Sequence, residues 1–320
     1  MKVLVAGGKG FIGSHLVNYL KAKGHWVRSV DVERNSYLKT KEDEFQPLDL
    51  RRYENVKTAV EGVDWIFNLA ANMGGIGFIS AYGADIMHDN ALINIYIAEA
   101  AVKSNVERVF FSSSACIYPA YKQLTPDALP LKEEFAVPAE PDQFYGWEKL
   151  FSEKLYEAYE RDCGLKIRIA RFHNIYGPYG TYKGGREKAP AALCRKVAEA
   201  KDSSTITIWG DGKQTRSFLY IDDCVEANVK LMESNYDRPL NIGSEELISI
   251  DRLADMIIAV SGKRLKKRYD LTKPQGVRGR NADLTLIRKV LGWEPRVSYE
   301  EGLKRTYRWI KKQKSEKADG

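Results

Sequence analysis

A tyrosine and a lysine four residues apart are the first pair in this 320-residue chain with the right types for acid–base chemistry. Tyr145 and Lys149 lie in the stretch YGWEK, near the start of a predicted helix, so both side chains project from the same side. A neighbouring ammonium lowers the pKa of a phenol and makes the phenolate a usable base near neutral pH. Alone, a YxxxK pair is a weak signal, and its meaning depends on what surrounds it.

A serine and a cysteine stand at the end of a predicted buried strand, in the stretch SSSACIYP (112–119). Residues two apart in an extended segment point to the same side, so Ser114 and Cys116 are expected to face the same space. A thiol there is a candidate acid or base if another group lowers its pKa or supplies the opposite proton. The alternative is a small core residue, as most cysteines are.

A second group that could exchange a proton on the side opposite the thiol has one candidate source, the glycine-rich segment KGGREKAP (183–190). It carries two lysines, an arginine and a glutamate within six residues, with Glu187 and Lys188 next to each other. Charge runs of this kind are usually solvated surface, and that interpretation stays open from the residues alone.

A glycine triplet in GGKGFIG lies between the first predicted strand (2–7) and the first predicted helix (11–24). Glycine there permits a tight turn, close approach of the backbone to a pyrophosphate and close packing of helix on strand. The unpaired N–H groups at the helix N-terminus then face the phosphates. A strand before and a helix after make this signal strong. The residues that we expect to contact NAD are Gly7, Gly10, Phe11, Ile12 and Gly13.

Two aspartates follow the next predicted strands. Asp31 ends the second strand and can accept hydrogen bonds from an adenosine ribose, which favours NAD over NADP, although Arg34 nearby leaves NADP open. Asp49 and Leu50 end the third predicted strand, where they are candidates for holding the adenine. A turn-capping role for Asp49 is an equal alternative.

Strands and helices alternate through the first half of the chain, which predicts an α/β, Rossmann-type, doubly wound parallel sheet. The predicted helices that follow the first are 84–104 and 142–161, the second starting near Asp142. The predicted strands are 2–7, 25–31, 45–50, 64–71, 108–114 and 165–172.

The pattern loosens after residue 172, where glycine and proline punctuate the chain. We therefore expect an NAD-binding domain over 1–172 and a smaller mixed α/β substrate domain over 173–320. The segment near 213–235 is predicted to return to the first domain.

Composition excludes several other classes. The net charge of +7 suggests nucleic acid, but the basic residues are scattered among nearly as many acidic ones, so no nucleic-acid partner is expected. No apolar run is long enough for a membrane, and no signal peptide is recognised. Four widely spaced cysteines without CxxC predict reduced thiols in a cytoplasmic protein. Four histidines without ligand spacing predict no metal site.

The glycine turn, the strand-end serine and the YxxxK pair together resemble the extended short-chain dehydrogenase/reductase superfamily. In that superfamily a Ser–Tyr–Lys set removes a hydroxyl proton while NAD takes the hydride from carbon. The resemblance implies these roles for Ser114, Tyr145 and Lys149.

Longer stretches are similar to the GDP-mannose 3,5-epimerase family over nearly the whole chain. The resemblance implies that Cys116 and Lys188 are the base and acid of epimerisation. Oxidising C4 of the hexose acidifies the C–H bonds at C3 and C5, and the products are GDP-L-galactose and possibly GDP-L-gulose. An expected homodimer follows from the same resemblance. The matching stretches are AANMGGIGF (70–78), SSACIYP (113–119), AEPDQFYGWEK (139–149), RFHNIYGPYGTYKGGREKAPAALCRK (171–196), WGDGKQTRSF (209–218) and GVRGRN (276–281).

Substrate contacts come partly from chemistry and partly from this resemblance. Guanidinium matches phosphate bidentately, so Arg216 and Arg278 are candidates for the diphosphate, with surface ion pairs as the alternative. Asn72 stands where the family has an acid before the methionine of the MGG stretch, which leaves the exact sugar open. The full set of expected substrate contacts is Gly74, Ser114, Cys116, Asn174, Glu187, Lys188, Lys196, Gln214, Arg216 and Arg278.

Three other functions remain as alternatives. A nucleotide-sugar 4-epimerase needs neither Cys116 nor Lys188. A 4,6-dehydratase usually needs an acid pair after the strand-five serine, where this chain has Ala115 and Cys116. A non-catalytic NAD-binding protein is expected to have lost Tyr145 or Lys149, and both are present.

Overall fold

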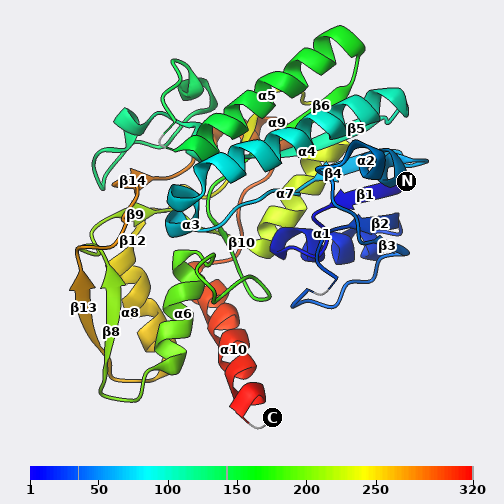
Figure 1. Cartoon of the computed structure of the whole chain (residues 1–320). Helices are drawn as coiled ribbons and strands as arrows, with labels where there is room; N and C mark the ends of the chain where they lie inside the picture. Colours follow the sequence, from blue (N-terminus) through cyan, green and yellow to red (C-terminus); the bar gives the residue numbers. More distant parts are fainter. Residues whose placement is uncertain (35, 142, 319–320) are drawn as a thin grey trace.

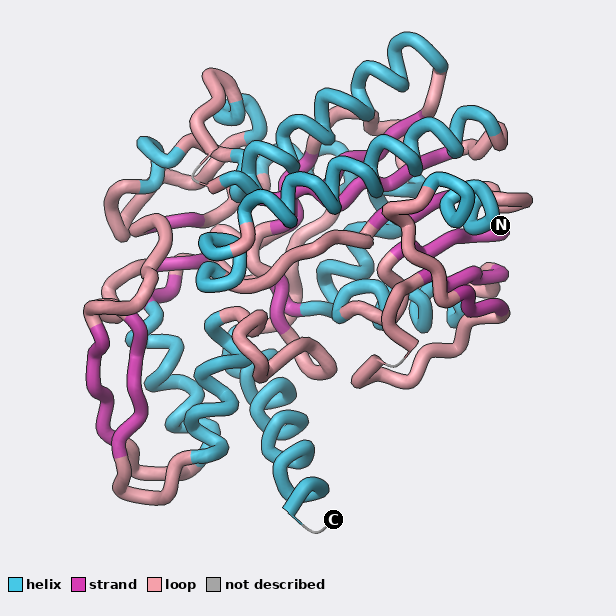
Figure 2. Tube along the Cα trace, viewed as in Figure 1, coloured by secondary structure: helices cyan, strands magenta, loops and turns pink. Residues whose placement is uncertain are grey.

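A seven-stranded sheet lies at the centre of the computed structural model, which describes residues 1–34, 36–141 and 143–318. Every pairing in this sheet is parallel, and the order is β3-β2-β1-β4-β5-β6-β11 (Figures 1 and 2). The predicted Rossmann-type α/β fold is therefore confirmed. The strands are β1 (Lys2–Ala6), β2 (Trp26–Val30), β3 (Glu44–Gln46), β4 (Trp65–Asn68), β5 (Arg108–Ser114), β6 (Lys166–Phe172) and β11 (Leu240–Ile242).

Helices cover both faces of the sheet because its strands are apolar on both faces. In β1, Val3 and Val5 enter one apolar cluster, while Leu4 and Ala6 enter the other. Helices α1 and α7 cover the first face, and α2, α4 and α5 cover the second (Figure 1). Their bounds are α1 (Phe11–Ala22), α2 (Tyr53–Val60), α4 (Gly83–Lys103), α5 (Phe144–Cys163) and α7 (Ile221–Glu233).

The third strand is shorter than predicted. It ends at Gln46, directly before Pro47, which has no N–H to donate to a ladder. The prediction that Asp49 and Leu50 end this strand is therefore wrong, and both lie in the turn that leads to α2. The predicted start of the helix at Asp142 lies outside the described residues, and α5 begins at Phe144.

A second lobe lies below the sheet in Figure 1. Three helices pack together there, and β8 pairs with β13 in parallel beside them. These elements are α6 (Ala189–Glu199), α8 (Ile250–Ser261), α10 (Tyr299–Ala318), β8 (Thr205–Trp209) and β13 (Lys266–Asp270).

Short elements connect the two lobes. A three-stranded sheet, in the order β12-β9-β14, lies between the large sheet and the second lobe. Its strands are β9 (Thr215–Arg216), β12 (Ile248–Ser249) and β14 (Gly279–Arg280). The other two short strands are β7 (Ile175–Tyr176) and β10 (Leu219–Tyr220). The remaining helices are α3 (Ile76–Ala81), α9 (Thr285–Leu291), η1 (Ala115–Ile117), η2 (Ala120–Gln123) and η3 (Glu133–Ala136).

The chain crosses between the lobes more than once. After β8 and β9, helix α7 packs on α1 and β11 joins the large sheet beside β6. One apolar cluster includes Val3 of the sheet together with Leu253 of α8 and Ile310 of α10. We propose that the chain still consists of two domains that meet near residue 172. These domains are interleaved, and one continuous apolar core joins them.

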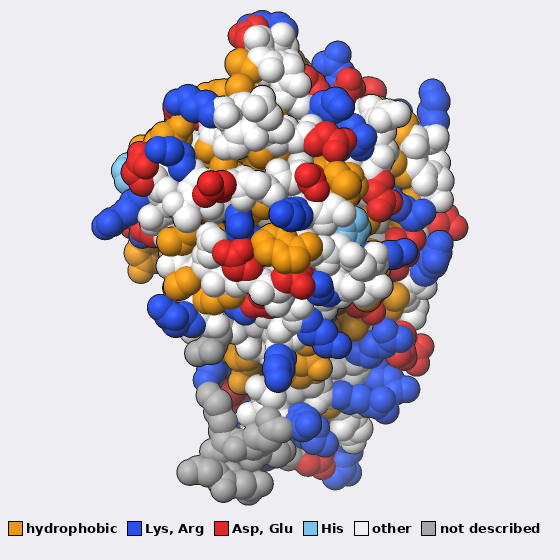
Figure 3. All heavy atoms as spheres, turned by 90° about the vertical axis from the view of Figure 1, so that its right-hand side faces the viewer, with side chains coloured by type: hydrophobic (Ala, Val, Ile, Leu, Met, Phe, Trp, Pro, Cys, Tyr) orange, Lys and Arg blue, Asp and Glu red, His pale blue; other side chains and the backbone are white. Residues whose placement is uncertain are grey.

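Basic side chains gather toward the lower part of the face shown in Figure 3, over the second lobe. Lys263 lies between α8 and β13 of the second lobe, and burial together with Lys311 and Lys314 lowers its pKa. Its ammonium donates to the carbonyls of Val197 at 2.8 Å and Ala200 at 2.6 Å, at the end of α6. This lysine therefore caps a helix. Among the described residues, no helix is long and apolar enough to cross a membrane.

Candidate active site

The end of β5 and the 3₁₀ turn after it hold the serine and the cysteine. Ser114 caps η1, and its Oγ accepts a hydrogen bond from the backbone N–H of Cys116 at 3.1 Å. The strand ends at Ser114, so the assumption of an extended segment through Cys116 is wrong. The 3₁₀ turn nevertheless leaves Cys116 half-buried and packed in the same apolar cluster as Tyr145.

Helix α5 brings Tyr145 and Lys149 to this strand end. Both side chains are buried, and the Lys149 ammonium lies 5.7 Å from the centroid of the Tyr145 ring. Gly146 permits the close approach of helix to turn, because a Cβ there would lie 2.1 Å from the Cys116 carbonyl oxygen. The tyrosine side chain is hydrogen-bonded to Ser114. Three segments of chain thus place serine, tyrosine, lysine and cysteine together.

Burial affects the pKa values of Tyr145 and Lys149 more than nearby charges do. Burial raises the pKa of Tyr145, and nearby Cys116 and Glu148 raise it further, while the hydrogen bond to Ser114 lowers it. Burial also lowers the pKa of Lys149, against the opposing charges of Glu148 and Glu153. Desolvation outweighs the pairing of charges because both groups lie in the protein interior. Tyr145 is therefore a neutral phenol here.

An arginine that the sequence did not single out contacts the cysteine. Arg280 Nη1 donates to Cys116 Sγ at 3.3 Å, and its Nε donates to Gln123. Arg280 lies in β14, in parallel register with Arg216 of β9, so the two guanidinium groups start from neighbouring positions. The stretch GVRGRN contains both Arg278 and Arg280, and the sequence offered no way to tell which one faces inward.

Lys188 stands at the N-terminus of α6, where it is the N-cap residue before Ala189. Burial lowers its pKa, while negative charge on Cys116 or Cys224 acts in the opposite direction. Lys188 therefore lies near enough to Cys116 for the charge of the thiol to affect its pKa, although the two residues belong to different elements. Glu187 beside it accepts hydrogen bonds from Gly185 N at 2.7 Å and from Arg195 Nη2 at 3.0 Å, and these bonds hold the loop.

The MGG stretch packs against the segment that carries Lys188. Gly75 N donates to the Arg186 carbonyl at 3.1 Å, and a Cβ on Gly75 would lie 2.6 Å from the Glu187 carbonyl oxygen. A Cβ on Gly74 would lie 2.8 Å from Phe78 Cβ, and the Arg186 guanidinium stacks 3.9 Å from the centroid of that ring. Gly74 therefore helps to fix the loop.

Three predicted substrate residues lie around β9. Arg216 Nη2 donates to the Gln275 carbonyl at 3.2 Å, and Asn174 Nδ2 donates to the Ser217 carbonyl at 3.1 Å. Gln214 is 4% exposed, and its Oε1 is buried without a hydrogen-bond partner within the described part of the chain. This orphaned oxygen is ready to accept a bond from a ligand.

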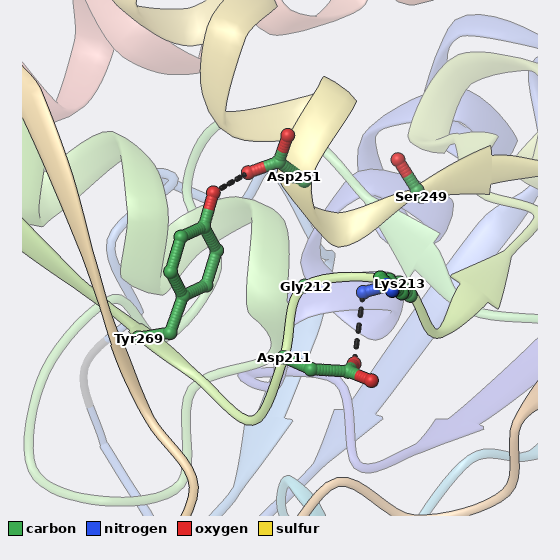
Figure 4. A pocket seen from close by; sticks show the side chains of 6 residues that line it. All are labelled: Asp211, Gly212, Lys213, Ser249, Asp251 and Tyr269. Atoms are coloured by element: carbon green, nitrogen blue, oxygen red, sulfur yellow. Dashed lines mark hydrogen bonds between the residues drawn. The ribbon is translucent and has the colours of Figure 1, made fainter.

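Two other predicted residues already have protein partners. Lys196 donates to the Thr207 carbonyl at 2.7 Å, and burial lowers its pKa. Arg278 makes two bonds to Asp211, at 3.1 and 3.0 Å, as the surface ion-pair alternative anticipated. A pocket next to this pair is lined by none of the predicted site residues (Figure 4); its lining is Asp211, Gly212, Lys213, Ser249, Asp251 and Tyr269.

The glycine turn fits a dinucleotide. Gly7 has φ +78°, and a Cβ on Gly13 would lie 2.0 Å from the Gly7 carbonyl oxygen, so α1 packs directly on the turn. Gly10 is the N-cap of α1, where no side chain caps the helix and no acidic residue lies in the first turn. The first N–H groups of α1, including those of Phe11 and Ile12, are thus open to a pyrophosphate.

The two aspartates predicted to contact the adenosine part of the cofactor, Asp31 and Asp49, have different hydrogen-bond partners. Asp31 accepts hydrogen bonds from Lys9 N at 3.0 Å and Glu33 N at 3.1 Å, and burial raises its pKa. Asp49 is held by Arg51 at 2.9 Å, which lowers the pKa of that carboxyl. Leu50 is buried. The geometry thus favours Asp31 for the ribose and the turn-capping alternative for Asp49. In residues 1–34, 36–141 and 143–318, no group of His, Cys, Asp and Glu is placed to hold a metal ion.

The doubly wound sheet, the glycine turn and the serine, tyrosine and lysine at the strand ends define an enzyme of the short-chain dehydrogenase/reductase type. The chain belongs to the NAD dependent epimerase/dehydratase family, whose model matches residues 3–243. Its cofactor is accordingly NAD.

The comparisons also identify nucleotide-sugar enzymes. The chain is 48% identical to GDP-mannose 3,5-epimerase of Arabidopsis thaliana, over 100% of this chain and 85% of that protein. The structure of UDP-glucose 4-epimerase from Thermotoga maritima is 28% identical, with a TM-score of 0.87 and coverage of 98% and 99%. UDP-glucuronic acid 4-epimerase from Bacillus cereus, solved with UDP-glucuronic acid and NAD, is 27% identical, with a TM-score of 0.83 and coverage of 98% and 100%. The enzyme class predicted from the sequence is confirmed.

Proposed function

We propose that this enzyme inverts C3 and C5 of the hexose of GDP-mannose through a 4-keto intermediate. Double inversion gives GDP-L-galactose, and inversion at C5 alone gives GDP-L-gulose. The observation that supports this most is the contact of Cys116 Sγ with the Arg280 guanidinium at 3.3 Å, beside Tyr145 and coupled to Lys188. The 48% identity to a GDP-mannose 3,5-epimerase supports the same reaction.

The redox part of the reaction uses the residues at the end of β5. NAD, when bound, accepts the hydride from C4 and later returns it. Tyr145 first loses its own proton to solvent, and the phenolate then accepts the proton of the C4 hydroxyl while Ser114 holds the same oxygen by a hydrogen bond. Because burial raises the pKa of Tyr145, forming that phenolate needs the positive charge of Lys149 nearby. The same hydroxyl groups then donate to the oxyanion of the enolate.

Cys116 is the proposed base for the inversions. The C4 ketone acidifies the C–H bonds at C3 and C5, and a thiolate can remove a proton from either carbon. A thiolate needs a neighbouring cation or donor to form near neutral pH. The Arg280 guanidinium supplies both at 3.3 Å. The cysteine is also half-buried rather than sealed in the core, so a substrate can reach it.

Lys188 is the proposed acid on the opposite face of the sugar. An ordinary lysine holds its proton too strongly to be an efficient acid near neutral pH. Burial lowers the pKa of Lys188 and thereby favours release of the proton. The N-terminus of α6 and the loop contacts of Glu187 and Gly75 fix this lysine in place.

The remaining polar groups suit the nucleotide half of the substrate. Arg216 lies in register with Arg280, so the two cations form one basic surface for a diphosphate. Gln214 Oε1, buried without a partner in the described residues, suits a donor on the sugar or the base. Asn174 contacts the carbonyl of Ser217, next to Arg216, and Lys196 lies on α6, and we infer that both complete the substrate contacts.

A deuterium experiment tests the function. The purified protein is incubated with GDP-mannose in D2O, and the sugar is read by NMR. We expect deuterium at C5, or at both C3 and C5, with new sugar isomers. Inversion at C4 without deuterium at C3 or C5 would instead establish a 4-epimerase, the class of the solved neighbours. Lys188→Gln is expected to slow deuterium incorporation while C4 oxidation continues.

We further infer a homodimer formed through α4 and α5. Three large side chains on α5 are exposed, with Phe144 at 62%, Trp147 at 44% and Phe151 at 47%. Tyr82, next to the start of α4, and Met87 in it add exposed apolar surface. Trp147→Glu is expected to give a monomer by light scattering. Trp209→Glu, at an exposed residue of β8, is expected to leave the dimer intact.

A cytoplasmic location is proposed from the four cysteines, all of them free thiols.

A further inference from the structure

A lysine lies inside the glycine turn and is turned toward an acidic partner. Lys9 stands between Gly8 and Gly10, and its ammonium donates to Thr40 Oγ1 at 2.6 Å and pairs with Glu42. The lysine and glutamate side chains are each only 9% exposed. The Lys9 ammonium also lies 4.5 Å from the centroid of the Phe45 ring. These contacts assign the lysine to an almost buried ion pair at the mouth of the cofactor site.

The segment that carries Glu42 is fixed to the first helix. Asn18 of α1 donates to the Lys39 carbonyl at 3.0 Å, and its Oδ1 accepts from Lys41 N at 3.0 Å. Asp43 accepts from Val27 N of β2 at 2.7 Å. Residues 39–43 therefore form a strap that runs from α1 to the start of β2. These hydrogen bonds fix the position of Glu42. The ion pair with Glu42 therefore determines where the Lys9 side chain lies.

Near the C-terminal end of β2, where the adenosine ribose of the cofactor is expected, negatively charged side chains outnumber the ammonium of Lys9. Asp31 follows β2 and accepts the backbone N–H groups of Lys9 and Glu33. Burial would raise the pKa of Glu42, but hydrogen bonds from Lys9 and Thr40 outweigh it and lower the pKa, so Glu42 is ionised. Its Oε2 is buried without a hydrogen-bond partner among the described residues. Lys9 thus contacts both carboxylates, Asp31 through its backbone N–H and Glu42 through its ammonium, and these three side chains together carry a net negative charge.

We propose that Glu42 sets the preference for NAD over NADP by holding Lys9 and neutralising its charge. The 2′-hydroxyl of NAD can donate to Asp31, whereas a 2′-phosphate brings negative charge to a site that is already negative. Without the charge of Glu42, the same place holds one carboxylate and an ammonium that still donates to Thr40 but has lost its carboxylate partner. A lysine in that state is a ready phosphate ligand.

A competition experiment measures this preference without using catalysis. The holoenzyme is equilibrated with equal concentrations of NAD and NADP and is then passed through a desalting column. The retained nucleotides are released by denaturation and separated by chromatography. We expect Glu42→Gln to raise the ratio of bound NADP to bound NAD at least about tenfold. We expect Lys9→Met/Glu42→Gln to lose that shift, because the freed lysine causes it.

Asp43→Asn is the matched control. Asp43 belongs to the same strap and pairs with Lys21 at 2.8 Å, so the substitution breaks a neighbouring ion pair and leaves Lys9 alone. We expect its nucleotide ratio to equal that of the unchanged protein. An unchanged ratio in Glu42→Gln would overturn the proposal. So would an equal shift in the double variant, which would point to Arg34 or to a general loosening of the strap.

Discussion

Two sets of residues meet at the end of β5, and the chain builds them in different ways. The redox set is Ser114, Tyr145 and Lys149, which comes from one strand and the helix that packs beside it. The proton-transfer set is Cys116, Lys188 and Arg280, which comes from a 3₁₀ turn, the start of α6 and the short strand β14. The first set lies within the Rossmann-type lobe, at the contact of one strand with one helix, whereas the second also uses α6 of the second lobe and the connecting strand β14.

The difference shows how a reaction is added to a shared fold. The sheet and α5 fix the redox set in a buried place, where desolvation dominates the pKa values of Tyr145 and Lys149. The proton-transfer set instead uses contacts between lobes, such as that of Arg280 with Cys116. Oxidation at C4 is therefore expected to survive changes in the second set, while inversion depends on both.

The largest expected effect comes from the redox set. Tyr145→Phe keeps the ring but removes the hydroxyl that accepts the proton, so turnover should fall by about 10³-fold or more. No reduced cofactor should accumulate when GDP-mannose is added, as followed by absorbance. Tyr156→Phe is the control, because Tyr156 is buried on the same helix and bonds only to Asn68 in the described structure. Oxidation at C4 that continues in Tyr145→Phe would contradict the role of Tyr145.

Loss of the thiol is expected to separate the two sets. Cys116→Ala should lower deuterium exchange at C3 and C5 by about 10²- to 10³-fold, because the base is gone. The transient absorbance of reduced cofactor should persist, since Tyr145 and Lys149 are intact. Cys163→Ala, at an exposed cysteine at the end of α5, should leave both signals unchanged. Exchange at the unchanged rate would make Cys116 a packing residue only.

Arg280 tests the contact between the lobes. Arg280→Gln should slow alkylation of Cys116 by iodoacetamide at pH 7, and slow C5 exchange, each by about 10-fold, because the thiolate loses a cationic donor. Arg280→Lys keeps the charge and should recover part of both rates. Arg278→Gln serves as the control for alkylation, because that guanidinium is engaged by Asp211. Equal alkylation in all variants would remove Arg280 from the proton-transfer set.

The last prediction concerns stability rather than turnover, and it rests on the buried side chain of His173. Burial lowers the pKa of His173 to about 3, and its Nε2 lies 3.0 Å from Asn241 Oδ1. Because the folded pKa lies below the unfolded value of 6.5, the stability from the neutral ring is complete above pH 6.5 and is lost as the pH falls toward 3. The loss should be about 2 kcal/mol at pH 5.

Urea unfolding between pH 8 and pH 4 measures this loss. His173→Asn should show a smaller slope of unfolding free energy against pH, whatever its stability at pH 8. His88→Gln is the control, because the side chain of His88 is 71% exposed. A slope in His173→Asn equal to that of the unchanged protein would mean that other groups carry the acid sensitivity.

The sequence predicted the redox set because its signals are local. Tyr145 and Lys149 share a helix face, and the glycine turn follows directly from a strand and a helix. Cys116 was predicted from an extended geometry to face the same side as Ser114, whereas the chain enters a 3₁₀ turn after Ser114. Arg278 was proposed as a diphosphate ligand and Arg280 was not considered, because the contact of Arg280 with Cys116 depends on the pairing of β14 with β9. The assignments of Cys116 and Lys188 as base and acid stay predictions.

The sequence by itself determined the parallel sheet, the glycine turn, the place of Asp31 after β2 and the class of enzyme. The first three rest on apolar periodicity or on residue spacing within about thirty positions, and the class of enzyme rests on the resemblance to a known family. Only the tertiary structure decided that Arg280 contacts Cys116, that Asp49 is held by Arg51 and that Lys9 pairs with Glu42. The partner of a charged side chain depends on which distant segments the packed lobes bring within a few ångströms, and no local pattern encodes that.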